Sequence, residues 1–130
     1  MPRILVADDD VVVQSLIDTI LVAEGFRVVP AAFGRDALRL AQTSPLALVI
    51  VDQRLPDVDG LDLARRIRAL VSHPILMLSA QMDESLMRLA HEAGVTACLG
   101  KPFRPAQLRQ QVIALIGGAA APAGSSDATP

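Results

Sequence analysis

The chain has 130 residues, of which 52% are hydrophobic and 20% charged, so it holds enough apolar material for one packed domain and wholesale disorder is excluded. Twelve basic against fourteen acidic side chains leave a net charge of −2, and with only three aromatic residues this composition argues against direct nucleic-acid binding. The single cysteine cannot form an internal disulfide bond, and no apolar run reaches the ~18 residues of a membrane span, so we expect a cytoplasmic protein without a membrane partner.

Short apolar runs alternate with amphipathic stretches five times along the chain, which predicts a parallel sheet with helical crossovers. The third run contains only Leu, Ala, Val and Ile, which is typical of a strand buried on both faces. The fold class is therefore predicted as α/β, a doubly wound, flavodoxin-like sheet of five parallel strands in the order 2-1-3-4-5. The expected strands are residues 4–7, 26–31, 46–51, 75–78 and 97–99.

Five helices are expected between and after these strands. Asp10 is a candidate N-cap of the first helix, and Gly25 ends it. Apolar residues at helical spacing are expected to face the sheet, among them Leu16, Leu70 and Leu89. The remaining helices are expected after Gly34 and before Pro45, and at about residues 61–71, 83–93 and 105–116.

The composition changes after the last predicted helix. Residues 117–130 consist almost entirely of Gly, Ala, Ser and Pro, without a large side chain that could be buried. We therefore expect a single domain at residues 1–116, followed by a flexible tail or a truncated linker at residues 117–130.

Polar side chains stand directly after four of the five predicted strands. Asp8 and Asp9 follow the first strand, Asp52 the third, Ser79 the fourth and Lys101 the fifth. In doubly wound sheets, ligands bind at the carboxyl ends of the strands, where the strand order reverses. Three carboxylates converging there need a cation, and oxygen ligands without His or Cys suit a hard ion such as Mg²⁺.

This set of groups also suits phosphoryl transfer. A carboxylate can attack a phosphoryl group to form an aspartyl phosphate, and the transition state then needs positive charge on its equatorial oxygens. The metal and Lys101 can supply that charge, and the Ser79 hydroxyl can donate a further hydrogen bond.

Together these motifs resemble the receiver domain of two-component response regulators, the chemotaxis-response-regulator-like family. The resemblance covers about residues 2–116, and any one of its motifs alone would be a weak signal. Four motifs in this order at four strand ends are specific. They are ILVADDD near the start, VIVDQRLPDVDG around Asp52, LMLSA at the end of the fourth strand, and GVTACLGKPF around Lys101.

The resemblance implies a role for each site residue. It makes Asp52 the phosphoacceptor, has Asp9 ligate Mg²⁺ directly, and has Asp8 support the metal through water. The backbone carbonyl of Arg54 corresponds to the family's main-chain metal ligand.

On the opposite side of the site, the resemblance implies that Lys101 pairs with the phosphoryl oxygens and that Ser79 reorients toward them on activation. Pro102 resembles the family's cis proline, which would aim the Lys101 side chain inward.

The function implied by the resemblance is a phosphorylation-driven switch. A histidine kinase or phosphotransfer protein would supply the phosphoryl group, in a Mg²⁺-dependent reaction. The chain would be a phosphoacceptor that assists its own phosphorylation and dephosphorylation, and not an enzyme acting on a free substrate. The surface of the fourth helix, fifth strand and fifth helix would then control an output domain, a partner or a second copy of the chain.

Two positions are notable against the family pattern. Cys98 stands where the family usually carries Tyr or Phe, whose rotation reports the phosphorylation state, so output here must be signalled by backbone and helix shifts. Arg54 is long and charged next to the expected phosphoryl group, and our hypothesis is that it slows the loss of phosphate.

Three other functions compete with this interpretation. The first is a receiver-like interaction module that works without phosphorylation, although such a module has no need of the five site residues. The second is a phosphohydrolase with an aspartyl-phosphate intermediate, although Arg54 stands where such enzymes carry a general acid. The third is a redox sensor based on Cys98, which would need a neighbour that stabilises the thiolate.

Overall fold

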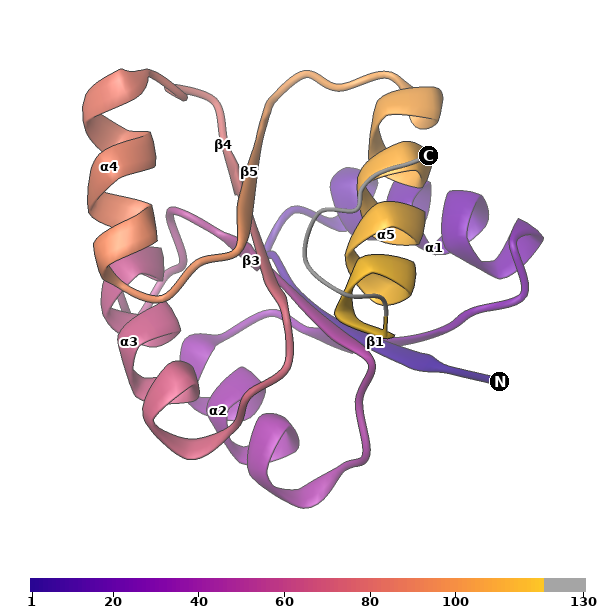
Figure 1. Ribbon diagram of the computed structural model, residues 1–130, viewed down its shortest axis with the longest axis horizontal. Helices are drawn as coiled ribbons and strands as arrows, with labels where there is room; N and C mark the ends of the chain where they lie inside the picture. Colours follow the sequence, from indigo (N-terminus) through magenta and orange to yellow (C-terminus); the bar gives the residue numbers. More distant parts are fainter. Residues whose placement is uncertain (121–130) are drawn as a thin grey trace.

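The computed structural model describes residues 1–120, and its five parallel strands form one sheet between two layers of helices (Figure 1). The strand order is β2-β1-β3-β4-β5, which confirms the predicted topology. The elements follow one another as β1 (Arg3–Ala7), α1 (Val11–Ala23), β2 (Arg27–Ala31), α2 (Gly34–Thr43), β3 (Leu48–Asp52), α3 (Gly60–Leu70), β4 (Ile75–Ser79), α4 (Glu84–Glu92), β5 (Ala97–Gly100) and α5 (Pro105–Ala120).

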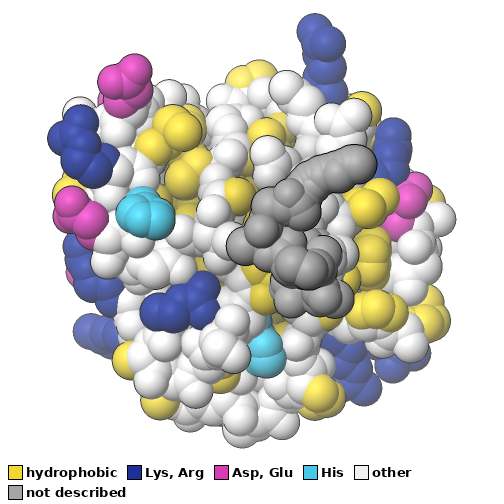
Figure 2. All heavy atoms as spheres, in the orientation of Figure 1, with side chains coloured by type: hydrophobic (Ala, Val, Ile, Leu, Met, Phe, Trp, Pro, Cys, Tyr) yellow, Lys and Arg dark blue, Asp and Glu magenta, His cyan; other side chains and the backbone are white. Residues whose placement is uncertain are grey.

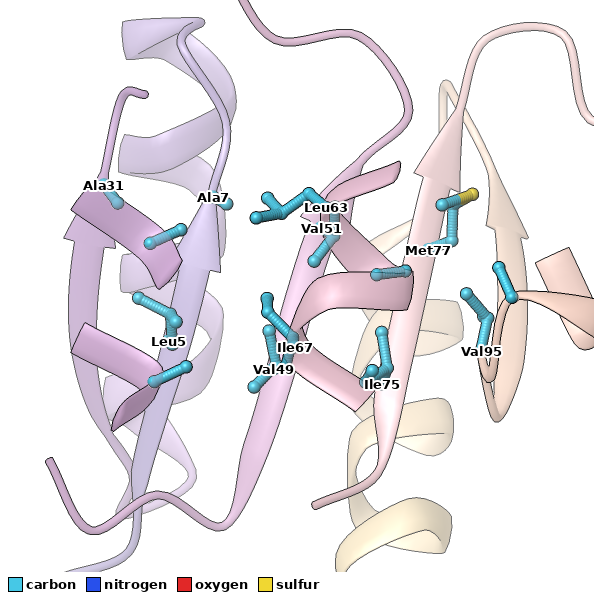
Figure 3. Packing of buried hydrophobic residues seen from close by; sticks show 14 of the residues in the cluster. Leu5, Ala7, Ala31, Val49, Val51, Leu63, Ile67, Ile75, Met77 and Val95 are labelled. Carbon is cyan, nitrogen blue, oxygen red and sulfur yellow. The ribbon is translucent and has the colours of Figure 1, made fainter. Parts of the chain in front are cut away.

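Successive side chains along each strand point to opposite faces of the sheet, so the central strands supply two separate cores. On one face, Leu5, Val49 and Ile75 pack under α2, α3 and α4 (Figure 3). On the other face, Ile4, Leu48 and Leu76 pack under α1 and α5. Every residue of β3 and β4 is buried, as the uninterrupted apolar third run predicts.

Aspartate side chains fix where three of the helices begin. Asp10 accepts hydrogen bonds from the Val12 and Val13 N–H groups at the start of α1, which confirms the predicted N-cap. Asp59 and Asp83 cap α3 and α4 in the same way. These caps set where the loops that follow β1, β3 and β4 end, and those loops begin next to the polar residues Asp8, Asp52 and Ser79.

Three leucines expected in the core lie at the surface instead. Leu16, Leu70 and Leu89 are 39%, 52% and 45% exposed. Adjacent residues of a helix are about 100° apart, so Leu16 and Leu89 lie at the margin of the buried stripe, next to the buried Ile17 and Ala90. Leu70 is the last residue of α3, where the helix leaves the sheet. The periodicity predicted the centre of each stripe correctly and overestimated its width.

The last helix is longer than the sequence predicts. α5 continues to Ala120, four positions beyond the expected end at Ile116. Gly117 and Gly118 do not end this helix, because alanines follow them and the next proline along the chain is Pro122. Residues 117–120 are therefore helical, and the rest of the predicted tail, residues 121–130, lies outside the described residues.

Hydrophobic side chains reach the surface over both α4 and α1 (Figure 2). Val11 and Val12 begin α1 and are 79% and 75% exposed, and Met87 on α4 is half exposed. Within residues 1–120, no helix combines the length and the apolar character needed to cross a bilayer.

Candidate functional site

The predicted site residues gather at the carboxyl edge of the sheet. Asp52 and Ser79 are the last residues of β3 and β4, Asp8 follows β1 directly, and Lys101 follows β5 directly. β1 and β3 are hydrogen-bonded neighbours, with Ala7 paired to Val51, so the chain segments that carry Asp8 and Asp52 leave the sheet side by side. This is the point where the strand order reverses, as the sequence predicts.

Three carboxylates form an acidic cluster at this point. Asp8, Asp9 and Asp52 each offer a carboxylate oxygen within 4.8 Å of the others. Asp8 is buried, Asp52 is 9% exposed, and Asp9 is open to solvent. The cluster therefore has a covered floor and an accessible side, which suits the entry of an ion or a phosphoryl group.

Lys101 places a positive charge within this cluster. Its Nζ lies 2.7 Å from Asp8 Oδ2 and 3.3 Å from Asp52 Oδ1. Its backbone N–H donates to the Ser79 carbonyl at 2.8 Å, which continues the β4–β5 pairing to the edge of the sheet. The Lys101–Pro102 peptide bond is cis, as the resemblance implies.

Burial and the neighbouring charges together shift two pKa values at the site. The pKa of Asp52 is raised above 3.8, mainly by burial and further by the charge of Asp8, while Lys101 partly opposes both effects. Burial alone would lower the pKa of Lys101, but its hydrogen bond to Asp8 and the two negative charges overcome that effect and raise it. Lys101 is therefore a permanent cation, whereas the negative charge on Asp52 is costly without further compensation.

The donor set fits a divalent, oxygen-seeking ion. Three carboxylates against one ammonium group leave two uncompensated negative charges, and all the groups offered are oxygens. Mg²⁺ prefers such ligands and binds through a few carboxylates while keeping several waters. Asp8, Asp9 and Asp52 are the side chains that would hold it.

A pocket of about 230 Å³ opens beside Asp52 and is bounded by the ends of β3 and β4. Two polar residues in its lining, Gln53 and Gln81, were not predicted from the sequence. Ser79 donates its hydroxyl proton to Gln53 Oε1 and accepts a hydrogen bond from the Gln81 N–H at 3.0 Å. The lining residues are Asp52, Gln53, Arg54, Ser79, Ala80, Gln81 and Lys101.

Arg54 lies at the mouth of this pocket. Its guanidinium group is exposed and donates to Gln81 Oε1 at 3.3 Å, so it spans the loops that follow β3 and β4. Its backbone also acts to lower the pKa of Asp52, less than Lys101 does. The predicted role of its backbone carbonyl as a metal ligand stays a prediction.

The loop after Asp52 is held against the strand end by a close approach of the backbone. The Gly60 N–H donates to the Gln53 carbonyl at 2.6 Å, and a Cβ atom at Gly60 would overlap the Asp52 carbonyl oxygen. Farther along, Asp57 accepts hydrogen bonds from the Gly34 and Arg35 N–H groups, which lowers the pKa of its carboxyl group. Asp57 thereby ties this loop to the start of α2.

Cys98 lies in β5 and packs against the core that α2, α3 and α4 cover. It is partly buried, and burial raises the pKa of its thiol. A raised pKa disfavours the reactive thiolate, so the environment of Cys98 resembles that of a small hydrophobic side chain more than that of a redox sensor.

Comparison with known proteins finds similarity over almost the whole described chain. Residues 4–113 match the model of a family described as the response regulator receiver domain. The chain is 38% identical over 116 residues to the transcriptional regulatory protein GltR of Pseudomonas aeruginosa, covering 87% of this chain and 48% of that protein. It is 33% identical over 115 residues to the alkaline phosphatase synthesis transcriptional regulatory protein PhoP of Bacillus subtilis, covering 88% and 48%. The chain thus spans about half the length of these curated relatives.

Solved structures show the same fold at similar identity. A putative response regulator from Chloroflexus aurantiacus aligns with a TM-score of 0.82 and 35% identity, covering 90% of this chain and 99% of that one. The receiver domain of a sensor histidine kinase from Pseudomonas aeruginosa aligns with a TM-score of 0.82 and 33% identity, covering 89% and 98%. That structure has a magnesium ion coordinated in the active-site cleft.

Proposed function

Because the chain belongs to the response regulator receiver domain family of two-component systems, we propose that Asp52 accepts a phosphoryl group in a Mg²⁺-dependent reaction and that Asp8, Asp9 and Lys101 assist. The observation that carries this proposal is the position of the Asp52 carboxylate. It borders an open pocket, within 3.3 Å of the Lys101 ammonium group and within 4.8 Å of two further carboxylates.

The chemistry follows from this arrangement. A carboxylate oxygen of Asp52 forms a bond to phosphorus while the P–N bond of a protonated phosphohistidine breaks and the imidazole leaves as a neutral group. Lys101 already contacts Asp52, so its ammonium group meets the phosphoryl oxygens without a large movement. When bound, Mg²⁺ supplies further positive charge at the same oxygens.

The same residues would assist the loss of the phosphoryl group. Water attacks phosphorus and the Asp52 carboxylate is released, so charge again develops on the oxygens next to Lys101. Arg54 stands at the mouth of the pocket, where it hinders the approach of water. The chain is in this sense a phosphoacceptor that contributes to its own phosphorylation and dephosphorylation.

The partners we propose follow from the chemistry of the site and from its accessible surroundings. The donor is a histidine kinase or a phosphotransfer protein with a phosphohistidine. The output surface is formed by α4, β5 and α5, where Met87 and Ile113 are 49% and 48% exposed. Since the chain spans about half of its curated relatives, the output would be an attached domain, a separate partner or a second copy of the chain.

An interaction module that works without phosphorylation is not favoured. Such a module would not have to keep a buried carboxylate whose pKa is raised and whose negative charge is therefore costly. Here that carboxylate is kept together with its counter-charge, Lys101, and with an open pocket.

Intact-mass spectrometry after incubation with acetyl phosphate tests the proposal. The parent protein should gain the mass of one phosphoryl group with Mg²⁺ and remain unlabelled with a chelator. The Asp52→Asn variant should stay unlabelled in both conditions, whereas Asp62→Asn, an exposed control acid that pairs with Arg65, should behave like the parent. Equal labelling of the parent and the Asp52→Asn variant would contradict the proposal.

A further inference from the structure

Ser79 uses both hydrogen-bonding functions of its hydroxyl group in the structure. The oxygen accepts the Gln81 N–H at 3.0 Å, and the single proton is donated to the Oε1 atom of Gln53. A hydroxyl group has only one proton to donate. In this arrangement Ser79 has none left for a phosphoryl oxygen on Asp52.

Gln53 is held in place for this contact. It follows Asp52 directly, its backbone N–H donates to the Leu78 carbonyl at 2.8 Å, and its carbonyl accepts the Gly60 N–H at 2.6 Å. The backbone of Gln53 is thus fixed on both sides, and its partly buried side chain bonds to Ser79 at the end of the neighbouring strand β4. The contact therefore joins the end of β3 to the end of β4.

We infer that Gln53 is a positioning residue that holds the Ser79 hydroxyl away from the acceptor site, so that phosphorylation of Asp52 must break the Ser79–Gln53 hydrogen bond. The inference rests on the proposed function, because it concerns the hydroxyl that would bond to the phosphoryl group.

The release of Ser79 also affects the loop that leads to α4. The oxygen that bonds to Gln53 is the one that accepts the Gln81 N–H, two residues before the N-cap Asp83 of α4. When the hydroxyl proton turns toward Asp52, the hydrogen bond to Gln53 is lost, and any shift of the oxygen that accompanies this turn also changes its hydrogen bond from the Gln81 N–H. Gln53 thus links the state of Asp52 to the β4–α4 loop without an aromatic side chain at the position of Cys98.

The binding of trifluoroberyllate, a phosphoryl mimic, in the presence of Mg²⁺ tests this inference by calorimetric titration. Gln53→Met keeps the length of the side chain and removes the acceptor. Since the parent must break one hydrogen bond on binding, the variant should bind the mimic about fivefold more tightly. Gln110→Met on α5 changes the same residue type at an exposed position and should bind like the parent. Gln53→Ala removes the same acceptor and replaces the methionine variant if that variant does not fold.

The same substitution in a Ser79→Ala background shows whether Gln53 acts through Ser79. Without the hydroxyl group, Gln53→Met should leave the affinity for the mimic unchanged. An unchanged or weaker affinity of the single variant would overturn the inference, and so would an equal gain in both backgrounds. If the parent protein does not bind the mimic at all, the proposed function itself fails, and the inference falls with it.

Discussion

The two halves of the site are held by different kinds of contact. The acidic half, Asp8, Asp9 and Asp52, stands at the ends of β1 and β3, and each of these strands has a paired strand on both sides. Both carboxylate oxygens of Asp8 are engaged, one by the Asp10 N–H at 2.9 Å and the other by Lys101 at 2.7 Å.

The switch half, Ser79 with Gln53 and Gln81, is held by hydrogen bonds between uncharged groups and has no ion pair. Its hydroxyl is fixed by one side-chain and one backbone hydrogen bond, and Gln81 itself is exposed. β5 beyond it is an edge strand whose four residues are only partly buried. The acidic half therefore suits cation binding, which needs fixed charges, and the switch half suits a conformational change, which needs hydrogen bonds that are easily replaced.

The sharpest test of this contrast is at Asp8. If the acidic half is a fixed cation site, Asp8→Asn removes one negative charge and frees Lys101 from its closest partner, so the affinity for Mg²⁺ should fall by about tenfold to hundredfold. Calorimetric titration with Mg²⁺ measures the change. Asp36→Asn on α2, whose carboxylate is exposed and 3.8 Å from Arg39, is the matched control and should bind Mg²⁺ like the parent. An unchanged affinity in Asp8→Asn would remove Asp8 from the site.

A smaller effect is expected on stability when the buried charge of Asp52 is removed. The pKa of Asp52 is raised in the folded protein, so the folded state binds more protons than the unfolded state, and stability decreases as pH rises from 3.8 through the raised pKa. At pH 7 with a chelator, Asp52→Asn should therefore increase the free energy of unfolding by about 1 kcal/mol in urea. The difference should shrink at acidic pH.

Addition of Mg²⁺ should reverse this order of stability. Under the proposed function, the ion would bind the folded parent more tightly than the folded Asp52→Asn variant or the unfolded chain, and binding to the folded state stabilises it. If Asp52→Asn were less stable than the parent in the chelator at pH 7, the charge of Asp52 would not be a cost, and the contrast between the two halves would have to be revised.

The smallest effect is expected at the mouth of the pocket. Arg54 is exposed and reaches Gln81 through one long hydrogen bond, so Arg54→Ala should shorten the half-life of the aspartyl phosphate by only about threefold, or ~0.7 kcal/mol. The time course of the phosphorylated mass after removal of acetyl phosphate gives the half-life. Arg88→Ala, an exposed arginine on α4, is the control. A longer half-life in Arg54→Ala would refute the hypothesis that this arginine protects the phosphate.

The acidic half was predictable from the sequence because its placement is local. A carboxylate directly after a buried apolar run must lie at the carboxyl end of that strand, and the strand order then brings Asp8 and Asp52 together. The Ser79–Gln53 bond was not predictable in this way, because it depends on how the side chain of a loop residue crosses to the neighbouring strand. A signal was present nonetheless: Ser79 directly follows an apolar run, which predicts the burial that the structure shows, and a buried hydroxyl proton needs an acceptor when no phosphoryl group is there.

Helix surfaces show the other limit of prediction from sequence. The spacing of apolar residues identifies which side of a helix faces the sheet, but the width of the buried stripe depends on how closely the helix packs. That is why Leu16, Leu70 and Leu89 are exposed although they share the periodicity of the core.

The ion pair between Asp8 and Lys101 joins residues 93 positions apart in the chain. During synthesis β1 emerges first and β5 is the last of the strands, so no shortened product that stops before Lys101 can complete the set of charges around Asp52. A ribosome-bound fragment or a proteolytic product that ends before Lys101 would thus be inactive as a phosphoacceptor under the proposed function, since it lacks the lysine next to Asp52.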